Sequence, residues 1–557
     1  MTRIEDYGLL GDMQSSALVG RDGSVDWLCL PRFDSPSCFS ALLGDEEHGR
    51  WLIVPAGGGQ ATSRRYRPGT LVLETDFETA DGAVRIIDFM PRRRAGPPRL
   101  MRIVEGLKGR VPMELELSVR PDYASIVPWV ERVPDGVLAT AGPDAFRLST
   151  TLPLEIENGT VRAEFVALEG ASERLALSWY LSYGEEPPVE DADSALARTE
   201  AWWRQWGDRC VYQGAYRNEV LTSLIVLKAM TFETTGAVIA APTTSLPEDI
   251  GGERNWDYRY CWLRDSVLAL EVMLATGYTE EALGFRDYLL RIGTGDPTKI
   301  QIMYGISGER RLTEFELDDL PGYEGSKPVR IGNAASEQFQ LDVYGEVLGV
   351  AFLGTEVIGR IEQRLWPRWR TVVEHVETIW REPDDGIWET RGPRRHFTHS
   401  KVMAWVVFDR AVRLCERFEL EAPWSAGGGR ATRSTGRSAT RATTASVARS
   451  RSTTDPKSSM QACSTSRSSV SSLGPTSASR ARSMRSRASW GGTASSLATP
   501  PPTPTTGSRV TKDSSWRAPS GWSARSRSTA ASTRPVPSSS ACSAFRTIWA
   551  SWPRSTT

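Results

Sequence analysis

Two patterns of hydrophobic and polar residues follow one another along the 557-residue chain. Up to about residue 190, apolar residues form short runs, and in residues 113–120 they alternate with polar ones, as in a half-buried strand. Asp81-Gly82 and Asn158-Gly159 lie between such runs and favour tight hairpins. The other expected strands are 14–19, 24–30, 71–75, 84–89, 154–156 and 161–165. Many short strands at this spacing predict an N-terminal antiparallel β-sandwich over residues 1–190.

From about residue 191 the apolar residues take a helical period. Residues 191–215 are expected to hold a linker helix whose Trp202, Trp203 and Trp206 bridge two domains. Apolar residues then recur at i, i+3, i+4 or i+7 in six segments, at 221–228, 267–274, 285–292, 341–348, 369–379 and 402–406. The long loops 234–262, 293–336 and 382–399 follow alternate helices. Loops gathered at one end of a helical array can build one pocket.

The composition changes abruptly after residue 424. Residues 1–426 carry 47 basic and 66 acidic side chains, whereas residues 427–557 carry 20 basic and 2 acidic ones. About a quarter of this tail is serine, and only eight of its residues are Leu, Ile, Val or Phe. Such a segment buries too little apolar surface to offset its ordering entropy, so residues 425–557 are predicted to be a disordered, low-complexity, basic tail.

Two hypotheses account for the tail. A shift of reading frame in GC-rich DNA would produce much Ser, Arg, Thr, Ala and Pro, as observed, and it is the hypothesis that we favour. The alternative is a genuine basic arm that binds nucleic acid or anionic surfaces. Under the frameshift hypothesis no nucleic-acid partner is expected, and the neighbouring frames of the gene should encode amphipathic helices and a glutamate-bearing loop.

Other function classes are disfavoured by composition. The N-terminus lacks a basic segment followed by an apolar one, and nowhere do eighteen apolar residues run together. We therefore expect a soluble, cytoplasmic protein without a membrane partner. Seven scattered cysteines and four histidines suggest neither a disulfide framework nor a metal site, and nothing in the chain calls for a cofactor. The oligomeric state is left open.

Candidate chemistry is concentrated in residues 251–265, which hold three acids, three arginines and four large aromatic residues. Sugars offer hydroxyls to charged side chains and C–H faces to aromatic rings, so this segment is suited to a sugar site. The alternative is a surface loop whose charges pair with one another. A second candidate is Glu389, directly after Trp388, because an apolar ring can help to raise the pKa of a general acid. An acidic turn that caps a helix is the alternative there.

These segments together resemble the glucoamylase family of inverting glycoside hydrolases. The similar residues are Tyr258, Trp262, Arg264-Asp265, the segment from Pro328 through Arg330 to Gly332, and Trp388-Glu389. Residues 4–12 and 22–36 resemble the β-domain of bacterial glucoamylase-like and trehalase-like members. The resemblance covers about residues 1–424. Some members have a second glutamate after the acid, where this chain has Thr390.

The resemblance implies a β-sandwich followed by an (α/α)6 barrel, of which residues 216–424 would be the first half. Arg264 and Asp265 would then grip hydroxyls of a non-reducing glucose, Tyr258, Trp262 and Trp388 would line its subsite, and Arg330 would add a binding contact. Glu389 would be the general acid. Inversion also needs a second carboxylate. In this family it lies in the last third of the domain, and this chain has no glutamate after Glu421.

The truncated barrel and the absent base predict little or no hydrolase activity for the chain as written. The function implied by the resemblance is hydrolysis of α-glucosidic bonds at the non-reducing ends of α-glucans. Trehalose is a close rival substrate, since it presents the same glucose. Either way the partner is a small oligosaccharide or disaccharide. Two other hypotheses are a non-catalytic sugar-binding remnant and a nucleic-acid binder that works through the basic tail.

Overall fold

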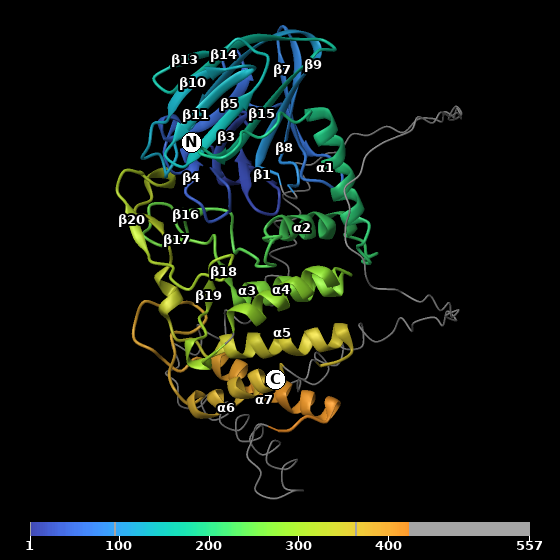
Figure 1. Ribbon diagram of the computed structural model, residues 1–557, viewed down its shortest axis with the longest axis vertical. Helices are drawn as coiled ribbons and strands as arrows, with labels where there is room; N and C mark the ends of the chain where they lie inside the picture. Colours follow the sequence, from blue (N-terminus) through green and yellow to red (C-terminus); the bar gives the residue numbers. More distant parts are fainter. Residues whose placement is uncertain (1, 94–95, 294, 362–364, 423–557) are drawn as a thin grey trace, which may run out of the picture. The chain divides into compact units, whose positions relative to one another are not determined.

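The computed structural model describes residues 2–93, 96–293, 295–361 and 365–422 (Figure 1). The chain divides into two compact units, Met1–Asp455 and Pro456–Thr557, and every described residue belongs to the first. The predictions for the tail, residues 425–557, therefore lie outside the described residues.

The N-terminal part is an antiparallel sheet domain, as predicted. Its longest strand, β9 (Arg99–Ser118), pairs along its first half with β8 and β15 and along its second half with β5 and β14. Strands of both groups contribute to one hydrophobic core. The other strands are β1 (Gly8–Gly11), β2 (Ser16–Val19), β3 (Ser24–Cys29), β4 (Ser37–Phe39), β5 (Arg50–Pro55), β6 (Ser63–Tyr66), β7 (Leu73–Thr79), β8 (Gly82–Phe89), β10 (Trp129–Val133), β11 (Gly136–Ala141), β12 (Asp144–Ser149), β13 (Glu155–Glu157), β14 (Thr160–Leu168) and β15 (Ser172–Leu181).

The two predicted hairpins both form, with different turns. Asn158 and Gly159 connect β13 to β14 and have φ values of 51° and 75°, as a type I′ turn requires. In the other hairpin Thr79 pairs with Gly82, so the connecting residues are Ala80 and Asp81 rather than Asp81 and Gly82. Gly82 is a strand residue, and a Cβ there would lie 2.0 Å from the carbonyl oxygen of Lys108. Close approach of β9 therefore explains this glycine better than turn geometry does.

The C-terminal part is helical, as predicted. After α1 (Ala192–Gly207), each of the six segments with helical period lies in or overlaps one helix. Small antiparallel strand pairs occupy the long connections: β16 (Thr244–Pro247) with β17 (Asn255–Asp257), β18 (Cys261–Trp262) with β19 (Met303–Tyr304), and β20 (Phe315–Leu317) with β21 (Val329–Ile331). The helices are α2 (Arg217–Ala229), α3 (Leu263–Ala275), α4 (Thr279–Ile292), α5 (Asp342–Ile358), α6 (Trp366–Ile379) and α7 (Thr398–Phe418).

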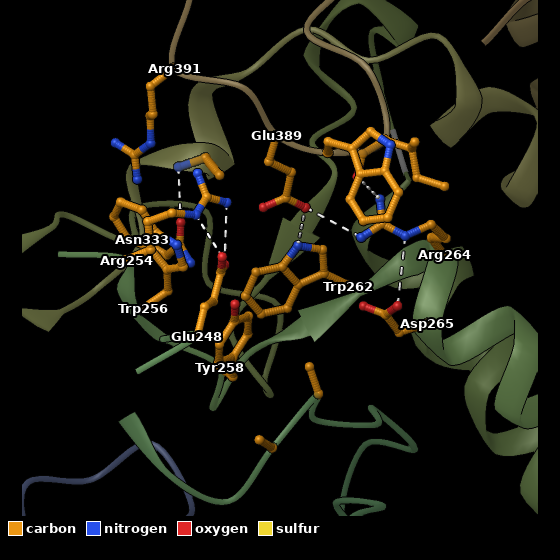
Figure 2. A pocket seen from close by; sticks show the side chains of 15 residues that line it. Glu248, Arg254, Trp256, Tyr258, Trp262, Arg264, Asp265, Asn333, Glu389 and Arg391 are labelled. Atoms are coloured by element: carbon orange, nitrogen blue, oxygen red, sulfur yellow. Dashed lines mark hydrogen bonds and ion pairs between the residues drawn. The ribbon is translucent and has the colours of Figure 1, made fainter. Parts of the chain in front are cut away.

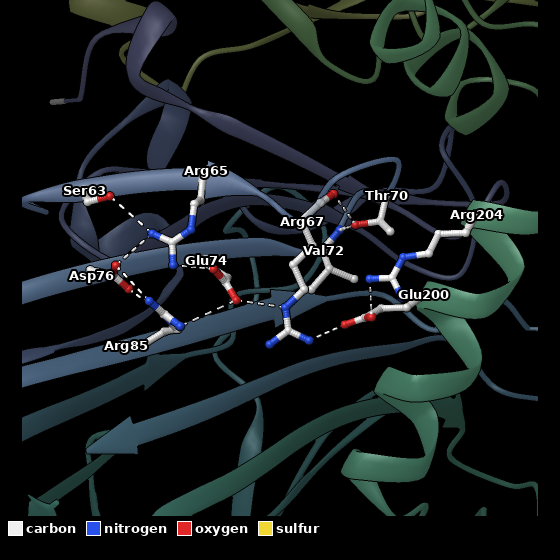
Figure 3. A network of polar contacts seen from close by, with 10 residues as sticks. All are labelled: Ser63, Arg65, Arg67, Thr70, Val72, Glu74, Asp76, Arg85, Glu200 and Arg204. Carbon is white, nitrogen blue, oxygen red and sulfur yellow. Dashed lines mark hydrogen bonds and ion pairs between the residues drawn. The ribbon is translucent and has the colours of Figure 1, made fainter. Parts of the chain in front are cut away.

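Helix α1 contacts both parts of this unit. Its Trp203 and Trp206 are buried in a cluster with residues of the sheet domain, such as Leu71, and of helix α2. The Trp206 ring stacks on Tyr278 at 4.1 Å. On the sheet side, Glu200 forms ion pairs with Arg67 and with Arg204 of α1, and Arg67 continues into the charged network of β6, β7 and β8 (Figure 3).

None of the helices in these described ranges is long and apolar enough to cross a membrane. Within the same residues, no group of three His, Cys, Asp or Glu side chains is arranged to hold a metal ion.

Candidate active site

A pocket of about 640 Å³ lies where the three long connections between helices meet (Figure 2). The connection between α2 and α3 supplies most of its wall, the one between α4 and α5 supplies Asn333 and Ala335, and the one between α6 and α7 supplies residues 387–389 and Arg391. The sequence predicted that these loops would gather at one pocket, and the structure brings them together. Such a volume is within the usual range for small-molecule sites.

Alternate residues of the segment 254–262 have opposite environments. Arg254, Trp256, Tyr258 and Trp262 line the pocket, whereas Asn255, Asp257, Arg259 and Cys261 have no exposed surface. Tyr260 departs from the pattern, because it is buried and does not line the pocket. The alternation follows from the extended backbone of β17 and β18, which turns successive side chains to opposite faces.

The buried side chains attach the segment to its surroundings. Arg259 and Asp257 form an ion pair at 2.7 Å, and both side chains have no exposed surface. Arg259 also donates to the Tyr123 hydroxyl at 2.7 Å and to the Ser35 carbonyl at 2.9 Å, both in the sheet domain. Asp257 accepts a hydrogen bond from the Gly332 amide at 3.2 Å. The wall of the pocket is therefore fixed from behind by the sheet domain and by the connection that follows α4.

Gly332 occupies a position that only glycine fits. Its φ is 76°, and a Cβ there would lie 1.9 Å from the Thr313 carbonyl oxygen. Beside it, Asn333 donates to the Asp257 carbonyl at 3.2 Å and its side chain accepts from the Ala335 amide at 3.0 Å. Asn333 is thus the N-cap of a short 3₁₀ helix (Ala334–Glu337), in addition to its place on the pocket wall.

Arg264 and Asp265 lie in the first turn of helix α3 and line the pocket. The Arg264 guanidinium lies 3.3 Å from Glu389 Oε1, 3.3 Å from the Ile387 carbonyl oxygen and 3.6 Å from Asp265 Oδ1. Asp342, whose side chain is only 3% exposed, lies 4.0 Å behind the same guanidinium. Arg264 is therefore held in a fixed position among carboxylates and a carbonyl group.

Glu389 lies between the pocket walls on an unusual backbone. Its φ is 53°, which few residues other than glycine adopt, and its amide donates to the Gly386 carbonyl at 3.0 Å. The Trp262 indole N–H donates to Glu389 Oε1 at 2.7 Å. Strained backbone is common at functional sites, where surrounding contacts maintain it.

Six of the seven residues singled out from the sequence line this pocket. They are Tyr258, Trp262, Arg264, Asp265, Trp388 and Glu389. The seventh, Arg330, does not line it. Its guanidinium lies 4.6 Å from the centre of the Trp256 ring, donates to the Glu253 carbonyl at 2.6 Å and pairs with Glu316 at 3.1 Å.

Five polar or aromatic side chains of the pocket were not assigned as site residues from the sequence, namely Glu248, Arg254, Trp256, Asn333 and Arg391, although Arg254 and Trp256 lie in the candidate segment 251–265. In an extended segment every second side chain points to the same face. Applied from Arg254 to Trp262, this rule would have placed Arg254 and Trp256 on the same face as Tyr258 and Trp262. Glu248 gives no such signal, because its place depends on the pairing of β16 with β17.

Comparison with known proteins identifies the family. A family model described as "Trehalase-like, N-terminal" matches residues 1–193, and one described as "Glycosyl hydrolases family 15" matches residues 214–495. The chain belongs to glycosyl hydrolases family 15. The resemblance predicted from the sequence is thereby confirmed.

Several proteins that are similar to this chain are trehalases. The chain is 39% identical to a trehalase of Mycolicibacterium smegmatis over 74% of its own length and 66% of that protein. It is 38% identical to a trehalase of Mycobacterium tuberculosis (74% and 65%) and 33% identical to one of Thermoplasma volcanium (76% and 68%). The alignments thus span about two thirds of the mycobacterial proteins. The family 15 match itself extends 73 residues beyond the last described residue.

Burial raises the pKa values of three groups that line the family 15 pocket. Burial raises the pKa of Glu389 above its usual value, although Arg264 and the Trp262 N–H oppose the shift. Burial also raises the pKa of Asp265, against the opposing charge of Arg264, and burial together with the charges of Glu248 and Glu389 raises the pKa of Tyr258 to about 12. The charged forms of Glu389, Asp265 and Tyr258 are therefore disfavoured by burial in this pocket.

A second set of acids lies behind Arg264. Burial and the charge of Asp342 raise the pKa of Glu346, on α5, to about 8. Burial also raises the pKa values of Asp342 and of Glu271 on α3. Of these acids, Asp342 lies 4.0 Å from the Arg264 guanidinium, which also contacts Glu389.

Proposed function

We propose that this site acts on α-glucosides, with trehalose as the favoured substrate and Glu389 as the general acid. One observation carries the proposal: the Glu389 carboxyl lies beside Arg264 and Trp262 in a pocket large enough for a disaccharide. The identity to several trehalases supports trehalose over other α-glucosides.

The contacts of Glu389 suggest how the proton is held. Both neighbouring donors, the Trp262 indole and the Arg264 guanidinium, address Oε1. This leaves Oε2 to carry the proton toward the glycosidic oxygen. The raised pKa keeps that proton in place until the leaving group takes it, as general acid catalysis requires.

The neighbouring residues would bind the glucose whose bond is cleaved. Arg264 and Asp265 offer charged hydrogen-bond partners to vicinal hydroxyls, and the Tyr258 and Trp262 rings, 5.7 Å apart, offer apolar faces to C–H groups. Trp388, which is 56% exposed, would cover the sugar from the solvent side. Arg330 would act indirectly by fixing Trp256.

An inverting reaction needs a second carboxylate about 6.5–9.5 Å from the first to activate water. The other carboxylates lining the pocket are Glu248, held by two hydrogen bonds from Arg254, and Asp265, which lies next to Arg264. We assign neither of them as the base. After Glu421 the sequence contains only Asp455 and Asp513 as acids. We therefore infer that α2 to α7 are half of a twelve-helix barrel and that hydrolysis by this chain is impaired.

The test combines binding with turnover. The purified 557-residue chain should bind trehalose saturably in calorimetry, release little or no glucose, and keep its affinity within about threefold in Glu389→Gln. If the neighbouring reading frame near codon 425 restores a glutamate-bearing loop, the frame-corrected protein should hydrolyse trehalose. In that protein Glu389→Gln should lower kcat by roughly 10²–10⁴. Turnover that is insensitive to Glu389→Gln would contradict the assignment.

Hydrolysis of α-glucan ends is the second candidate, because the sequence also resembles glucoamylases. Both substrates place a non-reducing glucose beside Arg264 and Asp265. The ratio of kcat/KM for trehalose to that for maltose, measured on the frame-corrected protein, distinguishes them. A ratio well below one would favour hydrolysis of α-glucan ends.

A further inference from the structure

A second polar group lies across the pocket from Arg264 and Asp265. In Figure 2, Glu389 and Trp262 occupy the middle, Arg264 and Asp265 lie on one side, and Glu248, Arg254 and Trp256 lie on the other. A proton donor in the middle of a pocket divides it into a place for the glucose that is cleaved and a place for the leaving group. The side opposite Arg264 is then the side of the leaving group.

Glu248 and Arg254 are arranged as a recognition element. Arg254 donates to Glu248 from Nε at 2.6 Å and from Nη2 at 3.2 Å. In the described part of the chain no hydrogen bond is formed by Arg254 Nη1, which remains available to a ligand. The pair therefore presents an unused donor beside carboxylate acceptors, which suits neighbouring hydroxyls of a sugar.

The wall behind this pair is held in place. The Trp256 ring lies 4.5 Å from the Arg391 guanidinium and 4.6 Å from that of Arg330. Both arginines approach Glu314, at 2.9 Å from Arg391 and 3.9 Å from Arg330. Glu314 also accepts the Ala334 amide at 2.9 Å. Three connections are thereby joined around one tryptophan, which fixes the position of this end of the pocket.

We propose that Glu248 and Arg254, beside the fixed Trp256, bind the leaving sugar and select a disaccharide over a glucoside with a small or apolar leaving group. The proposal rests on the proposed function. The alternative is an ordinary surface ion pair. The two side chains are 41% and 57% exposed, and a pair this exposed contributes little to stability. Its removal should therefore leave folding intact and change binding alone.

The test uses two ligands and the full chain, and it needs no turnover. Trehalose occupies both sides of Glu389, whereas the glucose-like iminosugar 1-deoxynojirimycin occupies only the side of Arg264 and Asp265. We expect Glu248→Gln/Arg254→Gln to raise the Kd for trehalose about tenfold and to change the Kd for the iminosugar less than twofold. Calorimetry gives both constants, and thermal unfolding should show an unchanged Tm.

A matched control is Glu157→Gln/Arg162→Gln, an exposed ion pair at 2.9 Å in the sheet domain, which should change neither constant. Equal effects of the Glu248/Arg254 substitutions on both ligands, or no effect on either, would overturn the leaving-sugar site while leaving the proposed function intact. If the unsubstituted chain binds neither ligand, the proposed function itself is wrong, and the leaving-sugar site with it.

Discussion

Asn255, Asp257, Arg259 and Cys261 alternate with Arg254, Trp256, Tyr258 and Trp262, yet the first set is fully buried and the second lines the pocket. Both sets contain charged groups. On the buried side Arg259 is paired with Asp257 and tied to Tyr123, and on the pocket side Arg254 pairs with an exposed Glu248. One extended segment can therefore place a buried ion pair on one face and pocket-lining side chains on the other.

The largest effect is expected on the buried face. Asp257→Ala leaves the completely buried Arg259 without its carboxylate, and breaking a buried pair in this way costs about 3–5 kcal/mol. Urea denaturation should show this loss, together with weaker binding of every sugar because the wall of the pocket loosens. Arg254→Gln, on the opposite face, is the matched control and should cost about 0–1 kcal/mol. Similar losses of unfolding free energy in both variants would contradict the different roles given to the two faces.

A second test asks whether buried charge behind the pocket also limits stability. The pKa of Glu346 is about 8 in the folded protein, above its value in the unfolded chain. Between those values the native state binds more protons than the unfolded state, so stability falls as pH rises. Glu346→Gln removes this slope. Its unfolding free energy should improve relative to the parent chain by roughly 3 kcal/mol between pH 5.5 and pH 8. Parallel pH profiles for the two proteins would contradict the assignment.

The pocket face should show the reverse balance of effects. Tyr258→Ala removes a ring that packs against Trp262 and faces the proposed glucose site. Binding of the iminosugar should weaken about tenfold, which corresponds to about 1.4 kcal/mol. The free energy of unfolding should fall by less than it does in Asp257→Ala. Calorimetry and denaturation on one preparation give both values. A larger loss of stability than of binding energy would place Tyr258 with the buried face.

The smallest effect concerns the proton on Glu389. The Trp262 N–H stabilises the charged carboxylate, so Trp262→Phe should raise the pKa of Glu389 further. Infrared titration of the carboxyl band, assigned by its loss in Glu389→Gln, measures this shift. In an active frame-corrected protein the alkaline limb of kcat/KM should move to higher pH. A lower pKa in the variant would show that the indole does not act on the charged form.

Several parts of the fold could be predicted because local chemistry determines them. Asn158-Gly159 adopts two positive φ values, and the amphipathic segments form α2 to α7. Strand β9 was predicted only from residue 113, although it begins at Arg99. Its first half contains Arg102, which is fully buried against Asp88 at 2.8 Å, so the alternation of polar and apolar residues is lost. Only the tertiary pairing reveals that stretch.

The site was predictable to a similar extent. Residue type indicated the segment 251–265 and Glu389, and the resemblance to the glucoamylase family singled out Tyr258 and Arg264 within that segment. The roles of these residues remain predictions. The direction of the Arg330 side chain could not be foreseen, because it follows from the pairing of Arg330 with Glu316 across β20 and β21. Glu314, which joins Arg330 and Arg391, lies outside both motifs in the sequence and carried no signal of its own.

Helix α1 belongs to neither matched family segment for most of its length, since one ends at residue 193 and the other begins at residue 214. Yet its Trp203 and Trp206 join Leu71 to Leu224 and Tyr278 in one apolar cluster. The boundary between the two family matches therefore falls within a tightly packed hydrophobic cluster. A fragment cut at residue 214 would lose the indoles of Trp203 and Trp206, which pack with Leu224 and Tyr278, so the helical part of this protein should be excised, fused or transplanted only together with α1.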